Sequence, residues 1–119
     1  MSKYTIFHNP RCSKSREALK ILEENDIAPD VIKYLDERPS AAQLKNLIKM
    51  LDLKSARDMM RIKEAVYKEL DLKNETNEEK LIQTMVDNPK LIERPIIIKD
   101  DKKAIIARPS EKAKEFLEA

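Results

Sequence analysis

Residues 4–16 read YTIFHNPRCSKSR and contain Cys12, the only cysteine among the 119 residues of the chain. The β-branched and aromatic residues Tyr4–Phe7 predict a short strand. Asn9-Pro10 ends this strand, because proline fixes its own φ and restricts the residue before it. From Ser13 onward, apolar residues recur at helical spacing. Cys12 is therefore predicted to lie where a strand becomes a helix.

A cysteine at a helix N-terminus is placed where its thiolate is favoured. The unpaired N–H groups and the positive end of the helix dipole stabilise anions, so a thiolate and an anionic ligand can share the site. Most lone cysteines of soluble proteins are small, buried, hydrophobic residues. A buried position is unusual for a residue with basic and turn-forming neighbours in the sequence. Those basic neighbours, set against the lone acid Glu17, are Arg11, Lys14, Arg16 and Lys20. We therefore interpret Cys12 as a reactive nucleophile.

His8 lies four residues before the cysteine and has two open interpretations. It can donate a hydrogen bond or charge to the sulfur and so help to form the thiolate. Alternatively, a histidine that ends a strand satisfies a structural hydrogen bond. The sequence does not decide between these roles.

Composition limits the function classes. With 41% hydrophobic and 39% charged residues, the chain can form one modest core. The formal net charge is +2, and charges of both signs are interleaved, so no basic stripe indicates nucleic-acid binding. No apolar stretch has the length of a signal core or a membrane span, and we expect a cytoplasmic protein. With one cysteine and one histidine there is no convincing ligand set, and no bound metal is predicted.

The order of predicted elements indicates the fold class. A second strand at 31–35 follows the first helix through a crossover of helical length, which predicts a parallel pair. Several helices are expected over about residues 40–90, including segments at 55–60 and 64–70. Capping-box spacing at Ser40 and Gln43, and again at Thr76 and Glu79, marks two of their starts.

The last third of the chain returns to strands. Two apolar runs, 95–98 and 104–107, surround a polar turn and predict an antiparallel hairpin, followed by a helix to about residue 117. The order β-α-β, helices, β-β-α is that of an α/β domain with the thioredoxin-like fold and a helical insert. Residues 1–119 are read as a single domain. Glycine is absent, so turns must use Asn, Asp, Pro or Ser, and a glycine-rich phosphate loop is excluded.

Three separated motifs resemble one family. HNPRCSKSR at residues 8–16, Arg94-Pro95-Ile96 and Arg108-Pro109-Ser110 together look like the glutathione/glutaredoxin-dependent arsenate reductases, nearly end to end. The resemblance implies that Cys12 is the nucleophile that converts arsenate to arsenite.

The resemblance also assigns roles to other residues. It implies that Arg61, Arg94 and Arg108 bind the oxyanion, that His8 and Ser15 favour the thiolate, and that the bond before Pro95 is cis. It further implies that no cofactor is bound and that glutathione is a co-substrate. A phosphatase-like arsenate reductase is disfavoured, because its C-x5-R loop would need an arginine where the chain has Ala18.

Physical chemistry supports part of this assignment. Guanidinium groups present planar forks of donors that suit tetrahedral oxyanions better than lysine does. Arg94 precedes a proline that begins one predicted strand, and Arg108 precedes a proline that ends another. Both arginines are therefore expected at strand termini, where clefts in α/β sheets are lined. Taken singly, each would be an ordinary surface arginine. Arg61 rests mainly on the resemblance, and Arg57 remains a competing choice.

A single protein thiol cannot complete a two-electron reduction. An external thiol is therefore required, which implies glutathione, with glutaredoxin or a similar protein to regenerate the enzyme. We expect a monomer that binds neither nucleic acid nor membrane. Two alternatives remain open: a glutathione-dependent oxidoreductase that acts on mixed disulfides, and a non-catalytic redox-regulatory binding module. The second is disfavoured because Ser15 replaces the second cysteine of a C-x-x-C switch.

Overall fold

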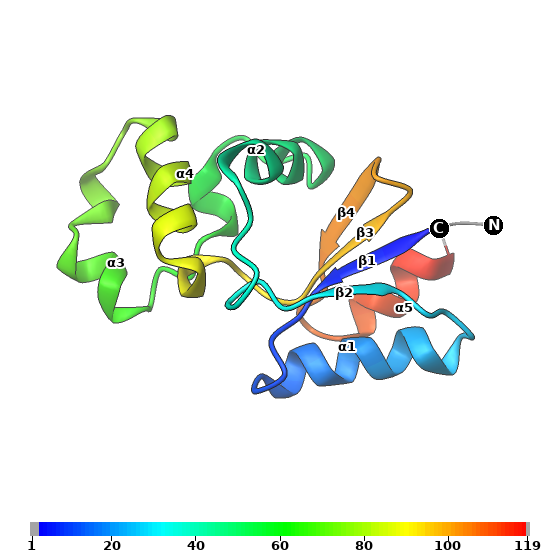
Figure 1. The fold of residues 1–119 in the computed structure, drawn as a ribbon. Coiled ribbons are helices and arrows are strands. Elements are labelled where there is room, and N and C mark those ends of the chain that lie inside the picture. Colours follow the sequence, from blue (N-terminus) through cyan, green and yellow to red (C-terminus); the bar gives the residue numbers. More distant parts are fainter. Residues whose placement is uncertain (1–2, 119) are drawn as a thin grey trace. The chain divides into compact units, whose positions relative to one another are not determined.

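The computed structural model describes residues 3–118, which form strands, α-helices and short 3-10 turns (Figure 1). In chain order these elements are β1 (Tyr4–Phe7), α1 (Ser13–Glu24), β2 (Asp30–Ile32), α2 (Ala41–Met50), η1 (Ala56–Met59), α3 (Ala65–Glu69), η2 (Leu72–Asn74), α4 (Glu78–Asp87), η3 (Pro89–Leu91), β3 (Ile96–Lys99), β4 (Lys103–Ile106) and α5 (Glu111–Glu118).

The chain divides into two compact units. The first contains the chain up to Glu37 and from Arg94 onward, and the second contains Arg38–Glu93. The helices expected over about residues 40–90 lie in the second unit. The interpretation of residues 1–119 as one domain stays a prediction.

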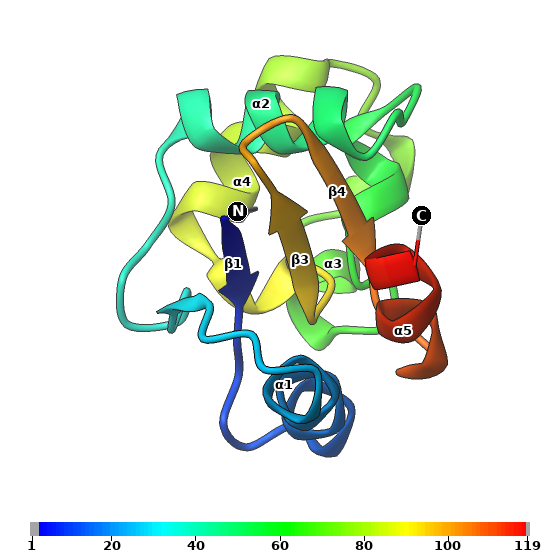
Figure 2. The same ribbon diagram turned by 90° about the vertical axis from the view of Figure 1, so that its right-hand side faces the viewer.

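The first unit is built on a four-stranded mixed sheet in the order β2-β1-β3-β4. β1 pairs with β2 in parallel, whereas β1 with β3 and β3 with β4 are antiparallel. Figure 2 shows β3 between β1 and β4. The predicted α/β class and thioredoxin-like order are confirmed.

The sheet register brings three chain segments to one edge. Phe7 at the end of β1 pairs with Ile96 at the start of β3, and Ile96 pairs with Ile106 at the end of β4. The loop that follows β1, the residues that precede β3 and the residues that follow β4 therefore lie side by side. This edge carries the cysteine loop and two of the predicted arginines.

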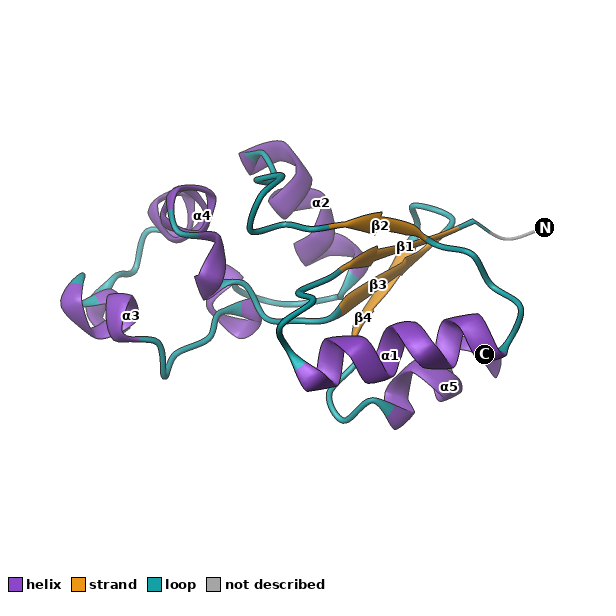
Figure 3. Cartoon of the chain, turned by 60° about the horizontal axis from the view of Figure 1, so that its bottom comes forward, coloured by secondary structure: helices purple, strands orange, loops and turns teal. Residues whose placement is uncertain are grey.

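The core of the first unit explains why α1 lies where it does. Figure 3 shows α1 and α5 side by side along one face of the sheet. One cluster of fully buried apolar side chains comes from both helices, from β1 and β3 and from the residue after β4, and consists of Ile6, Ala18, Leu22, Ile97, Ala107 and Ala113. Burial of these apolar groups is the main favourable contribution to packing, and it fixes α1 with its N-terminus at the sheet edge described above.

One predicted strand is shorter than expected. The sequence favoured a strand over residues 31–35, but β2 ends at Ile32. The next residues form a turn in which the N–H groups of Asp36 and Glu37 both donate to the carbonyl of Lys33, at 2.9 and 2.8 Å. Local turn hydrogen bonds have replaced the ladder, although Tyr34 remains buried and stacks on Phe7.

The second unit is helical. The predicted capping box opens α2, where the Ser40 side chain accepts from the Gln43 N–H at 3.2 Å and the Gln43 side chain accepts from the Ser40 N–H at 2.8 Å. The box predicted at Thr76 and Glu79 is wrong. Asn77 is the N-cap of α4 and accepts from the Lys80 N–H at 3.3 Å. Asparagine caps a helix as well as threonine, so spacing alone misplaced this start by one residue.

Aspartate supplies the left-handed backbone positions. The non-glycine residues with positive φ in the described chain are all aspartates, namely Asp26, Asp52, Asp71, Asp100 and Asp101. Aspartate tolerates this conformation better than most residues because its short side chain can hydrogen-bond locally. The glycine-free chain thus makes its tight turns as the composition predicted. Between residues 3 and 118, no helix has the length and apolar character needed to cross a membrane.

Candidate active site

The loop before α1 is held by short-range hydrogen bonds. The Asn9 carbonyl accepts from the Cys12 N–H, and the Asn9 side chain accepts from the Arg11 N–H, both at 3.0 Å. The Arg16 guanidinium returns from α1 and donates to the Pro10 carbonyl at 2.8 Å. This asparagine-centred turn fixes the direction in which the chain enters α1. The sequence indicated Arg16 only as a nearby positive charge, but its side chain also stabilises this turn through a hydrogen bond.

Cys12 is the N-cap residue of α1. Its backbone is extended, with φ −94° and ψ 122°, and its side chain is partly exposed. The thiol makes no capping hydrogen bond of standard geometry, yet it lies close enough to the first turn for the N–H groups there to affect its titration. The sequence prediction of a cysteine at the strand-to-helix junction matches this placement.

The pKa of the Cys12 thiol lies below its ordinary value. Burial raises this pKa, but four interactions outweigh burial: the N–H of Ser15, the positive charge of Arg94, the N–H of Lys14 and a hydrogen bond from the Arg94 side chain. Each of these stabilises the thiolate. The cation that lowers the pKa of Cys12 is thus Arg94, rather than the basic residues between Arg11 and Lys20 that the sequence suggested.

Arg94 reaches the thiol because of the sheet register. It lies two residues before Ile96, whose partner Phe7 ends the strand that leads to the cysteine loop. The Arg94–Pro95 peptide bond, which the resemblance predicts to be cis, is cis. An arginine held at the sulfur can neutralise the thiolate and also donate to an oxyanion bound beside it.

Arg108 lies next to the Arg94 segment. Its Nη1 donates to the Arg94 carbonyl at 3.4 Å, and the neighbouring Ala107 N–H donates to the Pro95 carbonyl at 2.9 Å. The Arg108–Pro109 bond is also cis, which the sequence reasoning did not predict. The structure therefore brings Arg94 and Arg108 together at the sheet edge that carries Cys12.

His8 contacts Ser15. The His8 Nδ1 lies 2.6 Å from the Ser15 Oγ, and this oxygen also accepts from the Asn9 N–H at 3.0 Å. Both side chains are buried. The contacts join the end of β1 to the first turn of α1, and the Ser15 N–H is one of the groups that lower the pKa of Cys12. Ser15 thus connects His8 with the thiol through the helix backbone.

The pKa of the His8 imidazole lies below its ordinary value. Burial lowers the pKa of its imidazole, and the positive charges of Lys33 and Arg16 lower it further. A lowered pKa disfavours the charged imidazole, so it does not support donation of charge to the sulfur, and the role of His8 in favouring the thiolate stays a prediction. Its contact with Ser15 is the kind of structural hydrogen bond that the other interpretation proposed.

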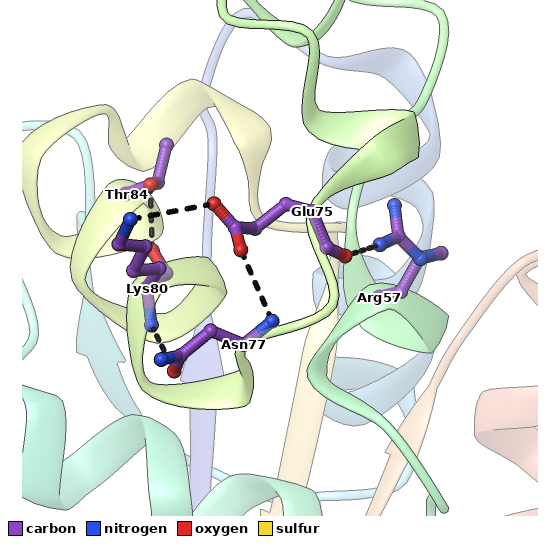
Figure 4. Close-up of polar contacts among 5 residues, drawn as sticks. All are labelled: Arg57, Glu75, Asn77, Lys80 and Thr84. Carbon is purple, nitrogen blue, oxygen red and sulfur yellow. Dashed lines mark hydrogen bonds and ion pairs between the residues drawn. The ribbon is translucent and has the colours of Figure 1, made fainter.

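Arg57 is a partly buried residue of the second unit. Its guanidinium donates to the Leu72 carbonyl at 2.7 Å and also to the Tyr67 hydroxyl and the Glu75 carbonyl. Figure 4 shows the contact with Glu75, whose carboxylate accepts from the N–H of Asn77 at 3.1 Å. Three acceptors occupy this guanidinium, so Arg57 is a structural residue and a poor choice for an oxyanion ligand.

Arg61 also lies in the second unit. Its Nη1 pairs with Glu64 at 2.7 Å and donates to the Lys90 carbonyl at 3.4 Å. Its side chain keeps 25% of its exposure, so it has fewer protein partners than Arg57. Its role as a third oxyanion ligand stays a prediction.

The N–H groups that begin α1 were expected to favour the thiolate, and those that lower the pKa of Cys12 are the N–H groups of Lys14 and Ser15. One contact near the site was not singled out from the sequence: Glu17, treated above as a lone acid, accepts a hydrogen bond from Ser110 at 3.1 Å. No sequence signal joins residues so far apart. Within residues 3–118, no three His, Cys, Asp or Glu side chains are clustered to hold a metal.

A thioredoxin-like sheet with a cysteine of lowered pKa at a helix N-terminus, beside two arginines, is an arrangement suited to thiolate chemistry on an anionic ligand. The family model described as the ArsC family matches residues 7–116. The chain therefore belongs to the ArsC family, the family of the arsenate reductases that follow.

Similar proteins include named enzymes and one without an assigned function. An arsenate reductase of Neisseria meningitidis is 49% identical over 112 residues, which cover 93% of this chain and 95% of that protein. The uncharacterized protein YfgD of Escherichia coli is 53% identical over 113 residues, 94% of each chain. The solved structure of an arsenate reductase from Vibrio cholerae has a TM-score of 0.91 at 47% identity and covers 95% of this chain and 96% of that one.

Proposed function

We propose that this protein reduces arsenate to arsenite with Cys12 as nucleophile and with glutathione and glutaredoxin as external reductants. The observation that carries the proposal is that two kinds of anion-stabilising group act on one sulfur: the Lys14 and Ser15 N–H groups that begin α1, and the Arg94 guanidinium. A second guanidinium lies beside Arg94, since Arg108 donates to the Arg94 carbonyl. A site that stabilises a thiolate in this way also suits the negative charge that develops on an oxyanion under attack.

In the first step the Cys12 thiolate attacks the arsenic atom of arsenate. An S–As bond forms, one As–O bond breaks, and the departing hydroxide takes up a proton to become water. Arsenic remains As(V) in this adduct. Arg94 and Arg108 offer planar donor forks to the remaining oxygens. Arg61 is proposed as a third donor on the strength of the family resemblance.

In the second step an external thiolate completes the reduction. A glutathione thiolate attacks the Cys12 sulfur, an S–S bond forms, and the electron pair of the S–As bond stays on arsenic, which leaves as As(III) arsenite. Two thiols have then been oxidised to one mixed disulfide. A glutaredoxin thiolate attacks its glutathione sulfur and releases the Cys12 thiolate. Because Cys12 is the only cysteine, the chain cannot perform this step alone.

The proposed setting follows from this chemistry. Glutathione and glutaredoxin are intracellular thiols, so a cytoplasmic location fits the reaction. No resident cofactor or metal is needed, because the electrons come from thiols. The sequence expectation of a monomer is retained in the proposal.

A second candidate is supported by the partial exposure of Cys12. An activated, accessible thiol without a resolving partner in the chain also suits the reduction of glutathione mixed disulfides. The arginines would then bind glutathione carboxylates. The third possibility, a regulatory binding module, would show neither activity.

One assay separates these functions. The purified protein is supplied with glutathione, glutaredoxin, glutathione reductase and NADPH, and NADPH oxidation is followed with arsenate or with a glutathione mixed disulfide as substrate. Arsenate-dependent turnover that disappears in Cys12→Ser supports the proposal. Because glutaredoxin itself reduces glutathione mixed disulfides, the mixed-disulfide assay is run without glutaredoxin. Cys12-dependent turnover there, without arsenate turnover, would favour the second candidate, and no turnover with either substrate would favour the binding module.

A further inference from the structure

A hydrogen bond joins α1 to the turn that follows β4. The Ser110 hydroxyl donates to the Glu17 carboxylate, with 3.1 Å between Oγ and Oε2. Ser110 is only 7% exposed, whereas Glu17 lies at the surface. Removing the acceptor of a buried hydroxyl costs more folding free energy than removing that of an exposed hydroxyl, because water does not freely take the place of the lost partner.

Each partner of this bond is rigidly attached to its own element. Glu17 lies within α1, the helix that begins after Cys12. Ser110 directly precedes α5, where the Ala113 N–H donates to the Ser110 carbonyl at 2.9 Å and the Lys112 N–H donates to the Pro109 carbonyl at 3.0 Å. The bond thus connects two helices that pack on the same sheet, close to the N-terminus of each.

Arg108 is two residues from Ser110 in this turn. Its own contact with the Arg94 carbonyl is long, at 3.4 Å, so that bond alone holds the Arg108 side chain weakly. We propose that Glu17 is a positioning residue: through Ser110 it holds the Arg108 turn against the helix that carries Cys12, and so sets the distance between the nucleophile and the Arg108 guanidinium. The substrate named in the kinetic test rests on the proposed arsenate reductase function.

The carboxylate acts here as a hydrogen-bond acceptor. Glu17 also pairs with Lys14, but the Nζ–Oε2 distance is 3.8 Å and the two side chains keep 46% and 50% of their exposure. An exposed pair of this kind contributes little. The bond to buried Ser110 is therefore the contact that matters. Glutamine at position 17 can preserve it, because its side-chain oxygen still accepts, whereas alanine cannot.

The first test measures how strongly the turn before α5 is held in its folded conformation, and it needs no substrate. Amide hydrogen exchange of the full-length protein is compared for the parental chain, Glu17→Ala, Glu17→Gln and Glu23→Ala. Glu23 is an exposed glutamate on the same helix and serves as the matched control. In Glu17→Ala we expect the amides of Lys112 and Ala113 to exchange about fivefold faster or more, with Glu17→Gln and Glu23→Ala near the parental rate.

The second test measures positioning in the reaction. In Glu17→Ala the KM for arsenate should rise about three- to tenfold with a smaller change in kcat, because a displaced guanidinium loses substrate binding. The pH midpoint of Cys12 alkylation should not move, and Glu17→Gln should restore the KM. In a Ser110→Ala background, adding Glu17→Ala should have no further effect, since both changes remove the same bond.

The outcomes are separable. If the parental protein fails to reduce arsenate, the proposed function is wrong, and the exchange data still decide whether Glu17 holds the turn. Unchanged exchange at Lys112 and Ala113 in Glu17→Ala would overturn the positioning role. Faster exchange with an unchanged KM would show that the turn is held for stability alone and would equally overturn it.

Discussion

Arg94 lies within hydrogen-bonding reach of the Cys12 thiol, although the two residues belong to opposite ends of the sequence. The antiparallel pairing of β1 with β3 creates this contact, because it sets the end of one strand beside the start of the other. One guanidinium can therefore serve two purposes: it stabilises the thiolate before the reaction and can bind an oxyanion during it.

The lowered pKa of Cys12 predicts its reactivity with iodoacetamide. The alkylation rate should rise with pH to a midpoint below that of a free cysteine thiol, since the thiolate is the nucleophile and the folded protein favours it. The measurement is the rate against pH for the native protein and for the same protein in urea. A native midpoint equal to or above the urea midpoint would contradict the activated thiolate.

Removal of Arg94 should raise that midpoint. Arg94→Ala eliminates both the charge and the hydrogen bond at the sulfur, so alkylation at a fixed pH below the free-thiol midpoint should slow. Arg108→Ala is the matched control, because Arg108 is not among the groups that affect this pKa. Equal shifts in both variants would show that general positive charge, rather than the Arg94 contact, lowers the pKa.

Lysine at position 94 or 108 tests the arginine fork. Each substitution keeps a positive charge but loses planar, two-point donation, so arsenate kcat/KM should fall about tenfold or more. Cys12 alkylation should be unchanged in Arg108→Lys and shift less in Arg94→Lys than in Arg94→Ala. Parental arsenate reduction by both lysine variants would remove the proposed oxyanion role of these residues.

The lowered pKa of His8 predicts that the free energy of unfolding decreases at acidic pH. Because the folded-state pKa is lowered, the unfolded chain takes up a proton at pH values where the folded protein does not. This contribution to stability is therefore complete above the unfolded pKa and is lost as pH falls from there toward the folded pKa. Urea unfolding near pH 7 and pH 5 should show a smaller decrease in the free energy of unfolding for His8→Gln than for the parental protein.

Arg57 should affect stability and leave the thiol unchanged. Arg57→Ala removes the donor for Leu72, Glu75 and Tyr67, and we expect a loss of about 2 to 4 kcal/mol in the free energy of unfolding. Arg61→Ala should cost less, because Arg61 keeps part of its exposure. If Arg61 binds the oxyanion as proposed, its replacement should instead raise the KM for arsenate.

Much of the fold was predictable because its signals are local. Tyr4–Phe7, the cysteine at the start of α1, the Ser40–Gln43 capping box and the 96–106 hairpin all follow from spacing within a few residues. The errors were local too. The second strand was drawn too long, because the turn at Lys33 was not recognised, and Asn77 was passed over as the cap of α4.

The sequence supplied candidates for the site and none of the contacts among them. Residue type and helix position marked Cys12 as a candidate nucleophile, and the resemblance selected Arg94 and Arg108 as candidate oxyanion ligands. The neighbouring cations looked like the source of thiolate stabilisation, yet the charge that lowers the pKa belongs to Arg94. Charge along the sequence does not reveal which side chain points at the sulfur.

By itself, the sequence determined the activated position of Cys12, the order of strands and helices, and the use of aspartate in place of glycine in tight turns. Backbone preferences and hydrophobic periodicity act over a few residues and can be read directly. Only the tertiary structure decided that Arg94 approaches the thiol, that His8 contacts Ser15, that Glu17 holds Ser110 and that Arg57 is occupied within its own unit. These contacts depend on sheet register and helix packing, which bring together residues that no local pattern connects.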